Sequence, residues 1–344
     1  MDRKVFSLKA LTKIYEQIKK PNISIWNMAI GDEIEEKAPT IEVHTKLAGR
    51  TRAPLVSRRE AGIFVDKQAF EVNTYTPGMI KLTAVNTAEA LLEQQFGQTI
   101  YATNTDAAAK KELARTLKDL QDIAMRTKLW MLLTLMTTGT CPIGDGKEGV
   151  KFDSSFAQTS LTSHDTFKNA DFDIVAWLEK QQLKIFQETG IEIDTIIMAP
   201  DVVEHFLKNN RVKDDQKNIN ANLIQLSQKI QTLSKGMKLV AVLPSLNLTI
   251  YSYIDWAKEP GQSAEKQLLP EKTIVGFKSG SFRVHYGALS LRPKQGEKAR
   301  LIIAKEVVRP FYPEASEDDE IQYFSAPIII PEDAKGYFAA KVIE

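Results

Sequence analysis

The sequence of residues 105–138, TDAAAKKELARTLKDLQDIAMRTKLWMLLTLMTT, predicts one long, uninterrupted helix. Apolar side chains recur at spacings of three, four and seven, which is the pattern of a helix with one buried face. Thr105 or Asp106 can cap its start, and Gly139 follows its end. At 1.5 Å per residue, this helix is roughly 50 Å long. The predicted buried stripe comprises Leu113, Leu117, Leu120, Ala124, Met131 and Leu135.

Upstream of the helix, residues 57–78, SRREAGIFVDKQAFEVNTYTPG, read as extended chain rich in strand-forming residues. Apolar residues such as Phe64 and Phe70 are interleaved with charges on both faces of the two-residue alternation. A ribbon that is partly apolar on both sides lacks a partner within its own chain, so it suits a position between neighbouring copies. Four arginines in or just before this segment, Arg50, Arg52, Arg58 and Arg59, make the ribbon locally basic.

Downstream of the helix, the pattern changes to alternating helices and strands, which indicates a compact α/β block over 166–299. The polar segment 255–271 is expected to be a loop. The predicted helices of the block are 171–189, 201–209 and 220–235. The predicted strands are 194–199, 238–243, 247–254, 273–277 and 282–291.

The last part of the chain, 300–344, returns to strand-like, apolar sequence interrupted by the acidic stretch EASEDDE at 314–320. Strands of this apolarity are rarely left exposed at a terminus. We therefore expect them to pair with segments far up the chain, beside the long helix.

Composition excludes several classes of protein. The 344 residues carry a net charge of +1, whereas proteins that wrap nucleic acid are usually far more basic. The single cysteine, Cys141, excludes internal disulfides and Cys-rich zinc sites. The longest apolar run, 129–136, is too short to span a bilayer, so no membrane partner is expected. No catalytic constellation or metal-ligand spacing appears among the four histidines, so we predict no enzyme, no metal and no cofactor.

The order of these parts resembles the tailed-phage major capsid proteins of the Hong Kong 97-type fold, and within them the phage lambda major capsid protein family. The stretches that carry the resemblance are RAPLVSRREAG (52–62), YTPGMIKLTAVN (75–86), DTIIMAPDVVEHF (194–206), LLPEKTIVGFKSGSFRVHYGAL (268–289) and IQYFSAPIIIPEDAKGYFAAKVI (321–343). Residues 1–45 match poorly.

The resemblance implies an α+β fold in five parts. These are an N-terminal arm (1–45), an extended β loop (46–82), a peripheral domain with the spine helix 105–138 (83–165), an α/β axial domain (166–299), and C-terminal strands that complete the peripheral domain (300–344).

The same resemblance implies a structural subunit that self-assembles into the pentamers and hexamers of an icosahedral shell enclosing double-stranded DNA. The implied partners are other copies of the chain, a scaffolding protein, a portal, a cementing or decoration protein, and packaged DNA contacted without sequence specificity. The shell would be assembled in the bacterial host cytoplasm and would become part of the virion.

Opposite charge suggests a contact between subunits in which the ribbon of one copy meets the acidic stretch of another. The candidate interface residues are Arg50, Arg52, Arg58, Arg59, Phe64, Phe70, Glu314, Glu317, Asp318 and Asp319. Two alternatives remain open. One is an encapsulin-like compartment of the same fold, and the other is an α/β enzyme or nucleic-acid-binding module with an oligomerisation arm.

Overall fold

The structure is a computed structural model of the whole chain. It describes residue 15 and the ranges 23–46, 70–86, 105–144, 149–217, 225–226, 232–234, 236–292, 298–311 and 319–344. Among these residues, no helix combines the length and the apolar character needed to cross a membrane.

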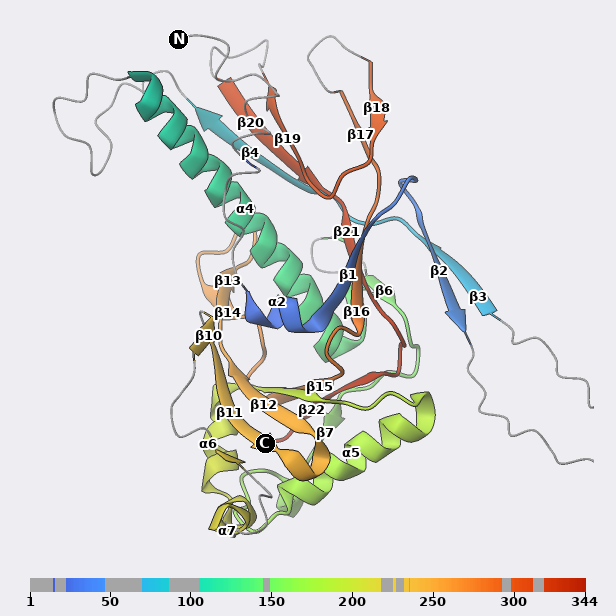
Figure 1. The fold of residues 1–344 in the computed structure, drawn as a ribbon, viewed down its shortest axis with the longest axis vertical. Helices are drawn as coiled ribbons and strands as arrows, with labels where there is room; N and C mark the ends of the chain where they lie inside the picture. The colour runs from blue at the N-terminus through green and yellow to red at the C-terminus, as the bar shows by residue number, and fades with distance from the viewer. Residues whose placement is uncertain are drawn as a thin grey trace, which may run out of the picture.

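The long helix predicted from the sequence is confirmed. Helix α4 spans Thr105–Thr138 and runs diagonally along the upper half of the molecule (Figure 1). It ends at Gly139, whose φ of 72° lies in the left-handed region and whose N–H donates to the Leu135 carbonyl at 2.8 Å. The predicted stripe is buried along its described length, from Leu113 to Leu135.

The largest sheet lies in the lower half of Figure 1 and has eight strands, with the central order β11–β12–β8–β15–β22. β8 runs parallel to β12 and antiparallel to β15. Every residue of β8 and β15 is buried, as expected for strands covered on both faces. Its strands are β7 (Thr159–Ser160), β8 (Thr195–Met198), β9 (Gln225–Leu226), β10 (Thr232–Ser234), β11 (Met237–Leu243), β12 (Leu248–Tyr253), β15 (Thr273–Phe277) and β22 (Tyr337–Lys341).

Three helices accompany this sheet, and two of them were predicted within a few residues. Asp173 caps the first helix by accepting a hydrogen bond from the Ala176 N–H, and Gly190 ends it with a φ of 81°. The helices are α5 (Ile174–Thr189), α6 (Pro200–Lys208) and α7 (Asn210–Lys217). Short 3-10 turns cover Ser163–Asp165 and Pro244–Leu246.

Three local predictions in this block are wrong. Residues 220–235 do not form a helix in their described part, because Gln225–Leu226 and Thr232–Ser234 are strands paired with β11. The predicted strand 282–291 is two strands, β16 (Phe282–Tyr286) and β17 (Leu289–Leu291), which belong to different sheets. The predicted loop 255–271 contains the hairpin β13 (Trp256–Lys258) and β14 (Glu265–Gln267).

The C-terminal strands pair with segments far up the chain, as predicted. β20 (Asp319–Ser325) lies between β19 (Val307–Phe311) and β4 (Ile80–Asn86). β21 (Pro327–Pro331) pairs with β16, which also pairs with β1 (Ile30–Glu35). Val308, Ile321 and Tyr323 pack on the upper half of α4 in a separate hydrophobic cluster. Because the last strand, β22, belongs to the largest sheet, strand pairing crosses the boundary expected at residue 299; the division into five parts stays a prediction.

The remaining elements form small pairs around this body. β2 (Ile41–Lys46) and β3 (Phe70–Tyr75) make an antiparallel ribbon that points away from the body at the right of Figure 1. β5 (Thr140–Pro142) pairs with β6 (Gly149–Lys151), and β17 pairs with β18 (Arg300–Ile302). Helix α2 (Ser24–Ala29) leads into β1.

Candidate assembly interface

The sequence-predicted interface residues fall mostly outside the described part of the chain. Arg50, Arg52, Arg58, Arg59, Phe64, Glu314, Glu317 and Asp318 lie outside the described residues. Phe70 begins β3, where its backbone is in register with Lys46, and Asp319 begins β20 in register with Asn86. The predicted contact between charged groups of two copies therefore stays a prediction.

The base of the β2–β3 ribbon is fixed to the body by apolar contacts. Ile41 is fully buried, and the Tyr75 ring meets the Phe152 ring edge-on with centroids 5.8 Å apart. The turn that follows packs tightly, since a Cβ on Gly78 would lie 1.8 Å from the Ile143 carbonyl oxygen. The ribbon thus leaves the body from a rigid base, which is what an element that reaches a neighbouring molecule requires.

A buried ionic junction joins the spine helix to the segment before β19. The Lys128 side chain on α4 is 3% exposed, and its ammonium lies 2.6 Å from the Glu306 carboxylate. The ammonium also donates to the Tyr286 hydroxyl at 3.4 Å and lies over that ring, 4.9 Å from its centroid. The Tyr15 hydroxyl donates to the other Glu306 oxygen. One lysine and one glutamate therefore connect four separate parts of the chain.

A second ion pair lies next to the first. Lys305 donates to Glu33 in β1 at 2.8 Å, and the indole N–H of Trp26 in α2 donates to the same carboxylate at 3.4 Å. Since Lys305 and Glu306 are consecutive, this segment ties the N-terminal elements and the spine helix to the C-terminal strands. We call Tyr15, Glu33, Lys128, Tyr286, Lys305 and Glu306 the ionic junction.

Both carboxylates of the ionic junction are held in their charged form. Burial alone would raise the pKa of Glu306, but the Lys128 charge and the hydrogen bonds from Lys128 and Tyr15 outweigh burial and lower that pKa. Burial likewise opposes ionisation of Glu33, while Lys305 and the Trp26 N–H lower its pKa below the ordinary value. Burial raises the pKa of the Tyr286 hydroxyl, which therefore stays protonated.

Sequence reasoning missed this junction, although one signal was available. In the predicted buried stripe of α4, Ala124 is followed by Met131, seven residues later. Lys128 lies between them at helical spacing, four residues after Ala124 and three before Met131, so it belongs to the same face. A charged residue on the buried face of an otherwise apolar helix needs a partner, because an unpaired buried charge is costly. The stripe therefore predicts an acidic partner without identifying Glu306.

Two side chains of types often used in catalysis, Cys141 and His285, are inaccessible or paired. Cys141 is buried, and burial raises the pKa of its thiol to about 12. The His285 Nδ1 lies 2.8 Å from the Glu36 carboxylate within the β1–β16 pair. Within the described ranges, no three His, Cys, Asp or Glu side chains are arranged to hold a metal ion.

Comparison with known structures places this fold among capsid proteins. A protein of an E. coli CFT073 prophage, assigned as its capsid protein, superposes with a TM-score of 0.68 at 14% identity over 98% of this chain and 99% of that one. A phage-related protein of Bordetella bronchiseptica RB50 gives 0.50 at 9% identity over 97% and 96%. The mature capsid of bacteriophage PhiM1 gives 0.50 at 8% over 94% and 88%. At sequence identities this low, the superpositions are evidence of the fold alone, and the fold that they show is of the Hong Kong 97 type.

The sequence itself assigns the family. The chain matches none of the curated proteins with which it was compared. The sequence profile described as phage major capsid protein E matches residues 7–342, nearly the whole chain. This match agrees with the resemblance seen in the sequence and with the observed fold. The chain belongs to the phage major capsid protein E family and is a structural subunit of a phage capsid.

Proposed function

We propose that this chain forms the pentamers and hexamers of an icosahedral shell that encloses double-stranded DNA, and that it has no catalytic role. The family match carries the proposal, because it extends over residues 7–342. The β2–β3 ribbon, which leaves the body from a rigid base, supports it as an element available to a neighbouring subunit (Figure 1).

We assign the contacts between subunits to two regions. The axial part, 166–299, meets its copies around the symmetry axes, and it carries large apolar side chains that water contacts in the single chain. Trp256 on the β13–β14 hairpin is 45% exposed and Leu183 on α5 is 58% exposed. The extended loop, 46–82, lies over an adjacent subunit. Burying exposed apolar groups of this kind is the main driving force in obligate interfaces.

The extended loop and the acidic stretch of a neighbour form a charged contact in this proposal. The basic side is Arg50, Arg52, Arg58 and Arg59, the acidic side is Glu314, Glu317, Asp318 and Asp319, and Phe64 and Phe70 add apolar contacts. Reversing Arg58 and Arg59 to glutamate is expected to block assembly, and adding Glu317→Lys and Asp318→Lys is expected to restore it. Lys118→Glu, on an exposed position of α4, is the control. Failure of the second pair to restore assembly would remove this contact from the proposal.

We propose the remaining partners from the resemblance to the tailed-phage capsid proteins. A scaffolding protein directs assembly in the host cytoplasm, a portal occupies one vertex, and a cementing protein binds outside. The net charge of +1 suits a container whose inner wall contacts DNA without holding it tightly.

Negative-stain electron microscopy tests the proposal. The chain is expressed alone and together with the candidate scaffolding protein. We expect closed shells or capsomer rings of uniform size in at least one condition. A monomer in both conditions would contradict the proposal.

A further inference from the structure

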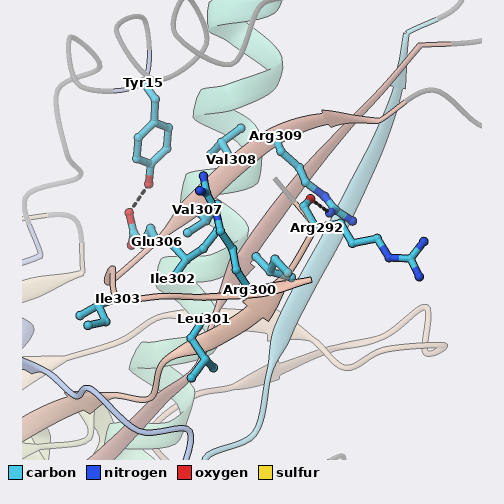
Figure 2. A pocket seen from close by; sticks show the side chains of 11 residues that line it. Tyr15, Arg292, Arg300, Leu301, Ile302, Ile303, Glu306, Val307, Val308 and Arg309 are labelled. Carbon is cyan, nitrogen blue, oxygen red and sulfur yellow. Dashed lines mark hydrogen bonds between the residues drawn. The ribbon is translucent and has the colours of Figure 1, made fainter. Parts of the chain in front are cut away.

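A groove separates the β17–β18 hairpin from β19 on the upper part of the molecule. Its volume is about 510 Å³, and Figure 2 shows the side chains that line it. Two kinds of side chain dominate its described walls: arginines (Arg292, Arg300, Arg309) and aliphatic residues (Leu301, Ile303, Val307). The groove adjoins the ionic junction and shares Tyr15 and Glu306 with it.

The arginines of the groove have no acidic partner among the described residues. Arg309 donates to the Gln322 side-chain oxygen at 3.1 and 2.8 Å and to the Arg292 backbone carbonyl. In the described part of the chain, no carboxylate lies within ion-pair distance of Arg292, Arg300 or Arg309. The one acid of the groove, Glu306, is already paired with Lys128. Burial lowers the pKa of Arg309, and the charge of Arg292 lowers it further. Counting only the residues that the structure describes, the positive charge of the groove is therefore uncompensated.

The aliphatic residues of the groove are exposed although they are large. Leu301 is 54% exposed and Ile303 is 49% exposed. Moreover, β18 and β19 are each the last strand of their sheets among the described residues, so both offer backbone groups along the groove. Apolar side chains next to unpaired strand edges fit an extended polypeptide, which can add hydrogen bonds and bury side chains at once. Duplex DNA would satisfy the arginines but would leave these aliphatic groups in water.

Strand β1 of this chain contains both acidic and aliphatic residues, but it already makes other contacts within the molecule. In β1 and the residue after it, Asp32 lies 3.9 Å from Arg283, Glu33 pairs with Lys305, and Glu36 contacts His285. This strand also pairs with β16. β1 is thus engaged within the same molecule and is not available to the groove.

We propose that the groove between β18 and β19 binds an extended segment of another protein in which acidic and aliphatic side chains alternate. The carboxylates pair with Arg292, Arg300 and Arg309, and the aliphatic side chains cover Leu301 and Ile303. The inference concerns binding by the chain itself and does not depend on shell formation.

Fluorescence anisotropy with a labelled eight-residue peptide of alternating glutamate and leucine tests this proposal on the full chain. We expect saturable binding that weakens with salt. Arg300→Glu and Leu301→Ser are each expected to weaken it by about fivefold or more, because they remove a charge pair and an apolar contact. The control variants Lys118→Glu and Ile123→Ser, on exposed positions of α4, should bind like the wild type. Circular dichroism checks that all four variants are folded.

Four results would overturn the proposal. The first is no binding of the glutamate–leucine peptide, and the second is equal binding of a lysine–leucine peptide. The third is displacement of the peptide by duplex DNA at lower concentration, which would make the groove a nucleic-acid site. The fourth combines two observations: the wild type does not bind the peptide, and Arg300→Glu loses the self-association that sedimentation measures in the wild type. That result would assign the groove to a second copy of the chain.

Discussion

The strands β8, β15 and β22 and the ionic junction hold the molecule together by different physical means. The strand cluster is almost entirely apolar and buried, and Ile197 and Phe277 are inaccessible to water. The central pair of the ionic junction, Lys128 and Glu306, is also largely buried, but its contribution depends on the two charges. An apolar contact depends little on pH, whereas a buried ion pair is sensitive to protonation and to the loss of either partner. The sheet thus fixes the body, and the junction fixes the attachment of the N-terminal elements and spine helix to the C-terminal strands.

The largest loss of stability is expected when a large buried side chain of the sheet is truncated. Phe277→Ala should lower the free energy of unfolding by about 4 kcal/mol, because it leaves a cavity against Phe282, whose ring centroid is 5.9 Å away. Urea unfolding of the unassembled chain measures it. Trp256→Ala truncates a residue that is 45% exposed and should lower the free energy of unfolding much less. Equal costs for the two variants would show that the sheet is not the apolar centre of the body.

Breaking the ionic junction is expected to cost slightly less. Lys128→Met should lower the free energy of unfolding by about 3 kcal/mol, because it leaves the Glu306 carboxylate buried without its cation. Glu306→Gln added to Lys128→Met removes that charge, so the double variant should be less destabilised than the sum of the two single variants. Additive costs in this double-mutant cycle would mean that the two side chains are not coupled.

The third prediction is that the pH dependence of stability distinguishes the ionic junction from the strands β8, β15 and β22. The pKa values of Glu306 and Glu33 are lowered in the folded chain, so the unfolded chain binds more protons on the acidic side. Their contribution is complete above the ordinary glutamate pKa of about 4.3 and is lost as the pH falls through the lowered folded-state values. Unfolding measured from pH 7 to pH 3 should show this loss, and Glu306→Gln should reduce it. An unchanged profile in Glu306→Gln would exclude this carboxylate as a source.

The smallest effect is expected at an exposed ion pair. Lys266 lies 2.8 Å from Glu259 on the β13–β14 hairpin, with both side chains in contact with water. Lys266→Gln should change the free energy of unfolding by less than about 0.5 kcal/mol, since water and salt screen such pairs. A loss comparable to that of Lys128→Met would mean that burial does not explain the difference between these two pairs.

Sequence reasoning succeeded where one periodic signal dominates and failed where tertiary contacts decide. The helix Thr105–Thr138 follows from its apolar repeat and its end at Gly139. Segment 220–235 has helix-compatible spacing, yet its described parts are strands because the edge of β11 supplies backbone partners. The hairpin at 256–267 was missed because its short strands are mostly polar and exposed. The partner of Lys128 lies 178 residues away, and no local pattern can identify it.

Hydrogen exchange of the wild type and Glu306→Gln at pH 7 tests most directly whether the ionic junction and the sheet are separate units of stability. We predict faster exchange in Glu306→Gln at residues 23–35 and 121–130, with residues 273–277 and 337–341 unchanged. Equal acceleration in the sheet, or no acceleration at the junction, would contradict this account.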